Sequence, residues 1–253
     1  MPRRRLLHDA RIEAGGAAAR DDVVVETRRV ARFGVSTDLV QVDTSLPTGF
    51  VRVTVADDGN AAYDILEPAA WDNLETTPTL LHRADTAQAI VFGTLAQRSG
   101  VTRDTLRRML DTRALKVLDV NLRPPHDDRE IVRDSLRRAD VVKLNEEEMQ
   151  RLASWLDLRG DLPRTVAALA ETFRCYTVCV TRGPRGAALL RDGRWSEHPG
   201  FEVEVRDTVG SGDAFLAVFL AGLLNGTADD ALLHNANLIG AYVATQHGEE
   251  RVA

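Results

Sequence analysis

The chain has 253 residues, of which 44% are hydrophobic and 28% charged, a balance that suits one α/β domain with a small appendage and a substantial core. A formal net charge of −6, with acidic and basic residues interspersed, argues against a broad nucleic-acid-binding surface. The longest apolar run, Ala214 to Leu224, is too short to span a bilayer, and the basic segment Met1 to Leu7 lacks the apolar core of a signal peptide, so a cytoplasmic protein without membrane contact is expected.

The first 35 residues show no clear strand period, and a hairpin is the first element that the sequence predicts. Thr48 to Val55 alternates apolar and polar residues, positions 57–60 carry turn residues, and the alternation returns over 62–66. An ordinary edge hairpin explains this pattern as well as a lid over a ligand does. Trp71 follows, and packing under the hairpin is expected of it more than a place in a ligand cleft.

From residue 89 onwards, strand-like apolar runs alternate with helix-like segments. This order predicts a parallel sheet whose strands are joined by right-handed crossovers. Cys175 and Cys179 have neither redox nor zinc-ligand spacing, so buried thiols are expected. The expected strands are 89–93, 115–120 and 176–180, with a hairpin over 187–191 and 194–198, and the expected helices are 103–110, 214–224 and 229–245.

Polar side chains follow several of these apolar runs, and ligands of parallel sheets collect beyond the carboxyl ends of strands. Asn121 and Arg123 follow the strand at 115–120; an arginine there can stabilise a transferring phosphoryl group, although a surface ion pair is its commoner fate. Asn145 leads into three glutamates that end with Glu148, and helix capping alone can explain both. Thr181 follows the strand at 176–180, where a plain turn is the alternative.

The stretch Asp207–Phe215 joins a strand-like segment at 201–205 to an apolar helix. Gly210 and Gly212 permit positive φ values and close backbone approach, so N–H groups can point outward at the first turn of the helix. With the helix dipole, those donors make a site for phosphate or a developing oxyanion. Asp213 lies in that turn and can either cap the helix or accept a proton from an attacking hydroxyl. Spacing alone leaves these two alternatives open.

Known motifs narrow the choice for this stretch. Phe215 stands where a dinucleotide-binding fingerprint has its third glycine, and the chain contains no P-loop sequence. Residues 207–215 instead resemble the DTxGxGDxF signature of the ribokinase-like (PfkB) family of carbohydrate kinases, and further matches to the family run from about Asp38 to the C-terminus. Residues 70–73 resemble a stretch of its fructokinase-like branch. The resemblance implies a ribokinase-like three-layer α/β/α fold in a single domain, with a mostly parallel central sheet and a small β lid at 48–66.

The resemblance also implies roles for the polar groups. Asp213 is expected to be the catalytic base and to contact the sugar hydroxyl, while the amides of Gly210, Ser211 and Gly212 are expected to form the anion hole. The other implied positions are Arg123 and Asn121 near the phosphates and sugar, Asn145 and Glu148 around Mg²⁺ and its waters, and Thr181, Gly183, Asp207, Thr208 and Asn237 around ATP.

The N-terminal region departs from the family pattern. Family members begin with a strand, a sugar-binding aspartate and a Gly-Gly-x-x-x-Asn stretch, whereas Gly15-Gly16 is followed by Arg20 at the position of the asparagine. Residues 20–22 fit a later Gly-Asp-Asp of the family better, which predicts an N-terminally incomplete sheet and an atypical segment 1–35. Glu249 replaces the usual alanine after Gly248, which predicts an altered adenine and monovalent-cation loop.

The sequence therefore predicts ATP-dependent phosphorylation of a sugar hydroxyl by a fructokinase-like enzyme. ATP and Mg²⁺ are the expected cofactors, a monovalent cation is a further candidate, and a homodimer is a candidate assembly. Two alternatives stay open. One is a non-catalytic nucleotide-binding protein that has lost its sugar site, and the other is a shortened chain whose exposed sheet needs a partner to fold.

Overall fold

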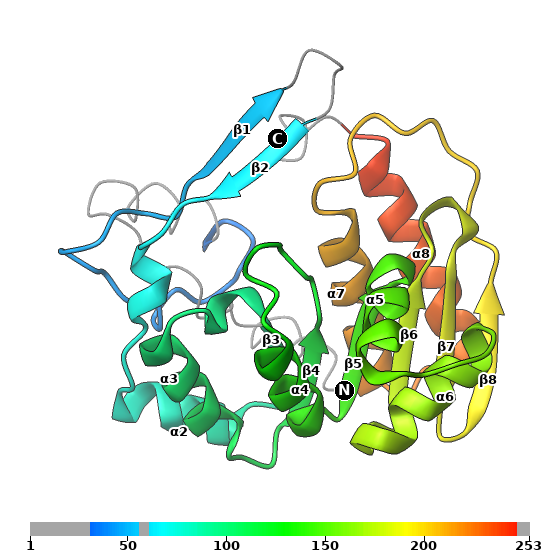
Figure 1. The fold of residues 1–253 in the computed structure, drawn as a ribbon, viewed down its shortest axis with the longest axis horizontal. Coiled ribbons are helices and arrows are strands. Elements are labelled where there is room, and N and C mark those ends of the chain that lie inside the picture. The colour runs from blue at the N-terminus through cyan, green and yellow to red at the C-terminus, as the bar shows by residue number, and fades with distance from the viewer. Residues whose placement is uncertain (1–30, 56–60, 247–253) are drawn as a thin grey trace. The chain divides into compact units, whose positions relative to one another are not determined.

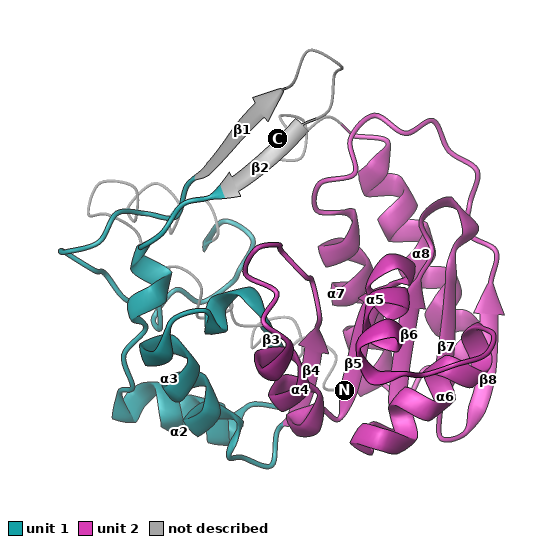
Figure 2. Ribbon diagram, viewed as in Figure 1, with its two compact units in different colours: residues 1–114 teal, residues 115–253 magenta. Residues whose placement is uncertain are grey.

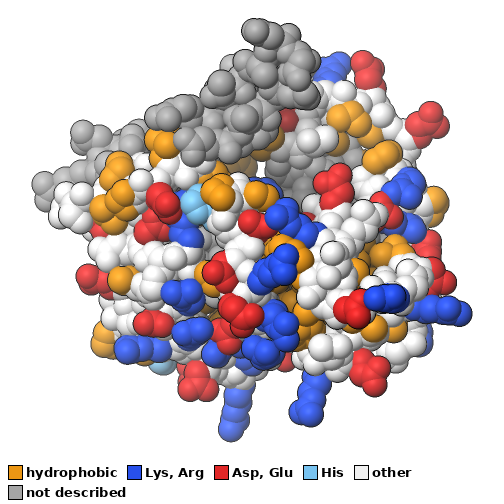
Figure 3. All heavy atoms as spheres, viewed as in Figure 1, with side chains coloured by type: hydrophobic (Ala, Val, Ile, Leu, Met, Phe, Trp, Pro, Cys, Tyr) orange, Lys and Arg blue, Asp and Glu red, His pale blue; other side chains and the backbone are white. Residues whose placement is uncertain are grey.

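The computed structural model describes residues 31–55 and 61–246, which fall into two compact units, 1–114 and 115–253 (Figure 2). The expectations about Gly15-Gly16 and residues 20–22, about the turn at 57–60 and about Gly248-Glu249 lie outside the described residues. Among the helices that are described, none combines the length and the apolar character needed to cross a bilayer. Figure 3 shows acidic and basic side chains intermixed on the face in view.

Unit 1 contains the predicted hairpin and a small group of helices (Figure 1). Strands β1 and β2 pair antiparallel, with Val53 opposite Tyr63, which confirms the hairpin. The predicted strand at 89–93 and the predicted helix at 103–110 are confirmed as β3 and α3, whereas α2 was not predicted. The elements of unit 1 are β1 Val51–Val55, β2 Ala61–Ile65, the 3₁₀ helix η1 Ala70–Asn73, α2 Pro78–Thr86, β3 Ala89–Gly93, the 3₁₀ helix η2 Leu95–Gln97 and α3 Gly100–Leu110.

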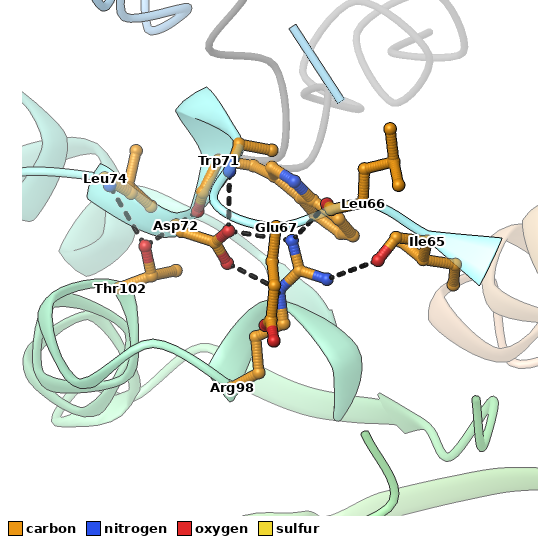
Figure 4. Close-up of polar contacts among 9 residues, drawn as sticks. Ile65, Leu66, Glu67, Trp71, Asp72, Leu74, Arg98 and Thr102 are labelled. Atoms are coloured by element: carbon orange, nitrogen blue, oxygen red, sulfur yellow. Dashed lines mark hydrogen bonds and ion pairs between the residues drawn. The ribbon is translucent and has the colours of Figure 1, made fainter. Parts of the chain in front are cut away.

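A buried arginine holds the end of β2 against η1 within unit 1 (Figure 4). Arg98 donates to both carboxylate oxygens of Asp72 at 2.8 and 2.7 Å and to the carbonyl oxygens of Ile65 and Leu66. Its guanidinium also lies 4.7 Å from the ring centre of Trp71. Such planar, multiply bonded pairing is what the fixed fork of arginine donors allows. Trp71 thus packs within its own unit, on the arginine.

Unit 2 contains five strands of a mixed sheet, in the order β4-β5-β6-β7-β8. The strands β4, β5 and β6 run parallel to one another, and β7 is antiparallel to both β6 and β8. The elements of unit 2 are β4 Leu115–Asp119, α4 Arg129–Arg138, β5 Val141–Asn145, α5 Glu146–Leu156, α6 Leu162–Phe173, β6 Thr177–Thr181, the 3₁₀ helix η3 Gly183–Arg185, β7 Ala187–Arg191, β8 Arg194–His198, α7 Ser211–Leu224 and α8 Asp229–Ala244.

Helices cover this sheet in two groups (Figure 1). Helices α4, α5 and α6 pack on strands β4 to β7, whereas α7 and α8 pack on each other and α8 packs on β7 and β8. The first four residues of β5 and of β6 are buried without alternation, as expected for strands covered on both faces. Cys175 and Cys179 are free and buried, as predicted, and burial raises the pKa of each thiol to about 12.

The predicted strand at 201–205 is wrong. The segment carries no strand pairing, and Val203 and Val205 are exposed together with the glutamates between and before them. Alternation predicts a strand only where one face is buried, and here neither face is. Helices α7 and α8 and the hairpin of β7 and β8 agree with expectation, with Asp192 and Gly193 both at positive φ in the two-residue turn. Helices α4 and α6 were not predicted.

Candidate active site

The turn that precedes α7 is fixed by bonds to itself and to α8. Gly210 has φ +76 and ψ −6, a left-handed conformation that glycine adopts without strain. The carboxylate of Asp207 accepts from the N–H of Val209 at 2.9 Å, and the carbonyl oxygen of Thr208 accepts from the N–H of Ser211 at 3.1 Å. The Ser211 hydroxyl donates to the carbonyl oxygen of Gly240 at 2.7 Å. The turn is therefore held rigidly before any ligand arrives.

The amides of this turn are not equivalent. The N–H of Ser211 is used within the turn, on the carbonyl oxygen of Thr208. By contrast, nothing in the described part of the chain accepts a hydrogen bond from the N–H groups of Gly210, Gly212 or Asp213. Gly212 and Asp213 lie in the first turn of a 14-residue helix, where the helix dipole adds to the donors. The first turn of α7 thus offers free donors to an anion.

Asp213 lies on the solvent side of the same helix turn. Its side chain is exposed and makes no hydrogen bond or ion pair with any described residue. Neither Asp213 nor Ser211 caps α7 through its side chain, so the capping alternative has no support here. The carboxylate is therefore available to a substrate hydroxyl.

Two of the predicted residues follow β4. Asn121 adopts φ +42, which asparagine tolerates better than most residues. Arg123 is exposed, its guanidinium donates to the carbonyl oxygen of Leu122 at 3.0 Å, and among the described residues it has no acidic partner. A structural ion pair, the commoner fate of such an arginine, is therefore not seen in the described part of the chain.

The predicted cap at the start of α5 is confirmed. Asn145 Oδ1 accepts from the N–H of Glu148, and Glu148 Oε2 accepts from the N–H of Asn145, both at 2.8 Å. Glu148 Oε1 also accepts from the N–H of Leu122 at 2.8 Å. Burial raises the pKa of the Glu148 carboxyl, and the two backbone hydrogen bonds oppose that shift. Glu148 therefore ties the loop after β4 to the start of α5.

These contacts bear on whether Asn145 and Glu148 could bind Mg²⁺ directly or through water. Both oxygens of Glu148 and the side-chain oxygen of Asn145 already accept backbone hydrogen bonds, so direct ligation by these atoms would have to compete with the fold. Hard oxygen atoms that keep one lone pair each suit a cation that retains its waters. The donor set therefore fits Mg²⁺ held through water and phosphate oxygens. Within the described residues, no group of three or more His, Cys, Asp or Glu side chains could form a direct cage.

The turn after β6 lies at the same end of the sheet as the start of α5. Thr181 pairs with Asn145 in the parallel register, and Gly183, at φ +58, opens η3. A cavity of about 390 Å³ lies next to this turn, lined by Arg182, Pro184, Arg185, Glu197 and Pro199. None of the predicted site residues lines that cavity. Asn237 is buried on α8, where its amide donates to the carbonyl oxygen of Leu233 at 2.8 Å.

Lys143 in this region was not predicted. Lys143, on β5, donates to both oxygens of Asp119, the last residue of β4, at 2.9 and 3.1 Å, and both side chains are buried. Burial raises the pKa of the Asp119 carboxyl, whereas the Lys143 ammonium lowers it. A lysine inside an otherwise apolar strand was the available signal, because lysines are rarely buried unless paired.

The fold is that of a ribokinase-like α/β protein, as predicted. Residues 28–251 match the family described as pfkB family carbohydrate kinase, and the chain belongs to that family. It is 30% identical over 202 residues, 78% of its length, to 2-dehydro-3-deoxygalactonokinase of Haloferax volcanii. It is 28% identical over 212 residues, 80% of its length, to a fructokinase of Rhizobium leguminosarum bv. trifolii.

A solved structure shows the same fold. A candidate ribokinase II of Escherichia coli in complex with ATP and Mg²⁺ superposes with a TM-score of 0.80 at 21% identity, over 95% of this chain and 78% of that one. The chain spans 58% of the length of the Haloferax relative and 62% of the Rhizobium relative.

Proposed function

We propose that the protein transfers the terminal phosphoryl group of ATP to a hydroxyl group of a sugar or sugar acid. One observation carries the proposal. The first turn of α7 presents the N–H groups of Gly212 and Asp213, which have no acceptor in the described part of the chain, beside an exposed and unbonded carboxylate on Asp213. Free donors for a phosphate next to a free base are the two groups that this reaction needs.

In this proposal, Asp213 accepts the proton of the attacking hydroxyl. The hydroxyl oxygen forms a bond to the terminal phosphorus, and the bond from that phosphorus to the ADP oxygen breaks. The amides of Gly210, Gly212 and Asp213 stabilise the charge on the phosphoryl oxygens, and the Ser211 amide supports the turn instead because it is bonded to Thr208. Arg123 adds a positive charge from the loop after β4.

The remaining site residues bind and orient. Asn145 and Glu148 would hold Mg²⁺ through its waters, and bound Mg²⁺ would neutralise charge on the phosphates. Asn121 would contact the sugar. The proposed contacts to ATP are made by Thr181, Gly183, Asp207, Thr208 and Asn237.

The names of the relatives indicate which acceptors to test first. The Rhizobium relative is named a fructokinase and the Haloferax relative a 2-dehydro-3-deoxygalactonokinase, so ketoses and 2-keto-3-deoxy sugar acids are the first acceptors to test. Hexoses, pentoses and nucleosides complete the panel.

The test is ADP release with Mg-ATP over this panel, for the wild-type protein and for Asp213→Asn. Loss of the base is expected to lower kcat by at least about 100-fold, because general base catalysis contributes about 10²–10⁴. Asp230→Asn is the matched control, since Asp230 is an exposed acid in the first turn of α8. Unchanged turnover in Asp213→Asn, or no acceptor-dependent ADP release by the wild-type protein, would reject the proposal.

A further inference from the structure

Only one of the chain's two lysines is buried beside the candidate active site. Lys116 and Lys143 are the two lysines in the sequence. Lys116 pairs with Asp140 over 3.7 Å, and both side chains are partly exposed. The side chain of Lys143 is 9% exposed, that of its partner Asp119 is 11% exposed, and the two form a short ion pair. Both charges have therefore been taken out of water.

The Lys143 ammonium lies directly against the first turn of α7. A Cβ atom placed on Gly212 would approach Lys143 Nζ to 3.3 Å, closer than ordinary van der Waals contact. Because Gly212 has no side chain, the Lys143 ammonium can lie close to the backbone there. The charges of Asp213 and Arg123 also act on the Asp119 carboxyl, the first raising its pKa and the second lowering it. These two residues, Asp119 and Lys143 therefore form one cluster of interacting charges.

The Lys143 ammonium retains one hydrogen-bond donor beyond those used on Asp119. A lysine ammonium has three N–H donors, and two of them are used on the two oxygens of Asp119. In the part of the chain that the structure describes, Asp119 is its only hydrogen-bond partner, so one donor has no acceptor. The ammonium thus lies against the first turn of α7, where the N–H groups of Gly212 and Asp213 have no acceptor among the described residues.

A buried ion pair of this kind is weak evidence for stability, because desolvation offsets most of its attraction and an apolar pair of the same shape often does as well. The placement of Lys143 therefore needs a different physical reason. A positive charge in a dry environment behind free amides strengthens a site for a multiply charged anion, since low effective dielectric constant and fixed orientation both favour it.

We propose that Lys143 is a positioning residue for phosphoryl transfer, whose ammonium, held by Asp119 beneath Gly212, reinforces the first turn of α7 as the receptor for the terminal phosphate. This inference rests on the proposed function. The charge acts on the group that distinguishes ATP from ADP, so Lys143 contributes more to ATP binding than to ADP binding and more to kcat than to the KM of the acceptor.

The test compares Lys143→Met with Lys116→Met, the same substitution at the other lysine. Calorimetry measures the dissociation constants of ATP and of ADP in the presence of Mg²⁺, and ADP release measures kcat and KM. For Lys143→Met, kcat is expected to fall about 100-fold, as for the loss of one preorganised donor, with the acceptor KM changed by less than about threefold. Its ratio of ATP to ADP affinity is expected to fall at least about tenfold, whereas Lys116→Met keeps wild-type values.

Lys143→Met leaves Asp119 buried without its partner, which could prevent the variant from folding. A second variant keeps the test possible in that case. Asp119→Leu/Lys143→Met removes both charges and is expected to fold. An unchanged ratio of ATP to ADP affinity in whichever variant folds would overturn the proposal, as would a wild-type protein that binds ATP no more tightly than ADP. Because nucleotide affinity needs no acceptor, this result is independent of whether any sugar is phosphorylated.

Discussion

One ion pair with both side chains buried lies in the described part of each unit, and the two pairs differ in how fully the hydrogen-bond donors of the cation are used. In unit 1, Arg98 binds Asp72 through two donors and the carbonyl oxygens of Ile65 and Leu66 through the others (Figure 4). In unit 2, Lys143 binds Asp119 alone among the described residues. The Arg98 guanidinium makes four hydrogen bonds within its own unit, whereas the Lys143 ammonium keeps a donor beside the candidate active site.

The difference shows that two buried ion pairs can have different roles in one protein. An arginine whose planar fork is filled by a carboxylate and two carbonyl oxygens fixes the positions of three chain segments, here the end of β2, η1 and η2. A lysine is a compact point charge, and Lys143 Nζ lies so close to the backbone of Gly212 that a Cβ atom added there would be 3.3 Å from it. We therefore expect the first pair to determine stability and the second to determine activity.

The largest effect is expected for Arg98→Met. It leaves Asp72 buried without its counter-charge and frees two carbonyl oxygens, so the free energy of unfolding should fall by about 3–5 kcal/mol. Urea denaturation followed by tryptophan fluorescence measures the change. Arg107→Met is the control, because Arg107 and Asp104 form an exposed pair whose loss should cost less than about 1 kcal/mol. Equal losses in the two variants would contradict the assignment of Arg98 to stability.

Gly212→Ala probes the other pair. The added methyl group would lie 3.3 Å from Lys143 Nζ, so the ammonium must shift away from the turn. We expect kcat to fall about tenfold, equivalent to about 1.4 kcal/mol in the activation barrier. Gly100→Ala, at the first position of α3, is the control, since a Cβ atom there meets nothing closer than 3.8 Å. Wild-type turnover in Gly212→Ala would show that the contact with Lys143 has no catalytic consequence.

The pH dependence of stability reports on the buried carboxyl groups of unit 2. Burial raises the pKa of Asp119 and of Glu148 above the ordinary values of 3.8 and 4.5. Between the ordinary and the raised pKa, the folded protein binds protons that the unfolded chain has lost. The free energy of unfolding should therefore fall as pH rises through that interval, by up to about 1.4 kcal/mol per pH unit for each group.

Glu148→Gln isolates one of these contributions, because glutamine does not titrate. Denaturation midpoints of the variant and the wild-type protein are measured from pH 4 to pH 8. The stability of the wild-type protein relative to the variant should fall as pH rises through the raised pKa of Glu148. A difference between the two proteins that does not change with pH would show that this pKa is the same in the folded and unfolded chains.

The smallest effect is expected for Ser211→Ala. It removes the hydrogen bond from the Ser211 hydroxyl to the carbonyl oxygen of Gly240, which should cost about 1 kcal/mol in the free energy of unfolding. Since the hydroxyl is used within the fold, kcat should change by less than about threefold. A loss of activity comparable to that of Asp213→Asn would instead assign the hydroxyl to the reaction.

Elements with a strong local signal were predictable. The hairpin of β7 and β8, the strand β3 and the cap at Asn145 follow from alternation, turn residues and capping chemistry within short windows. The segment 201–205 shows the limit of that reasoning, because its alternation matches a strand but no buried face supports it. Helix α4 was missed although Asp128 caps it through two backbone N–H groups.

Residues 207–215, read as a sequence, determined the glycine turn, the helix that follows it and the place of Asp213 in its first turn, because backbone freedom and helix polarity act over a few residues. Tertiary structure alone decided which amides stay free, that Glu148 joins two strand ends, and that Lys143 lies beneath Gly212. Those facts depend on contacts between residues at the ends of neighbouring strands. These residues are far apart in the sequence, so local sequence patterns do not predict their contacts.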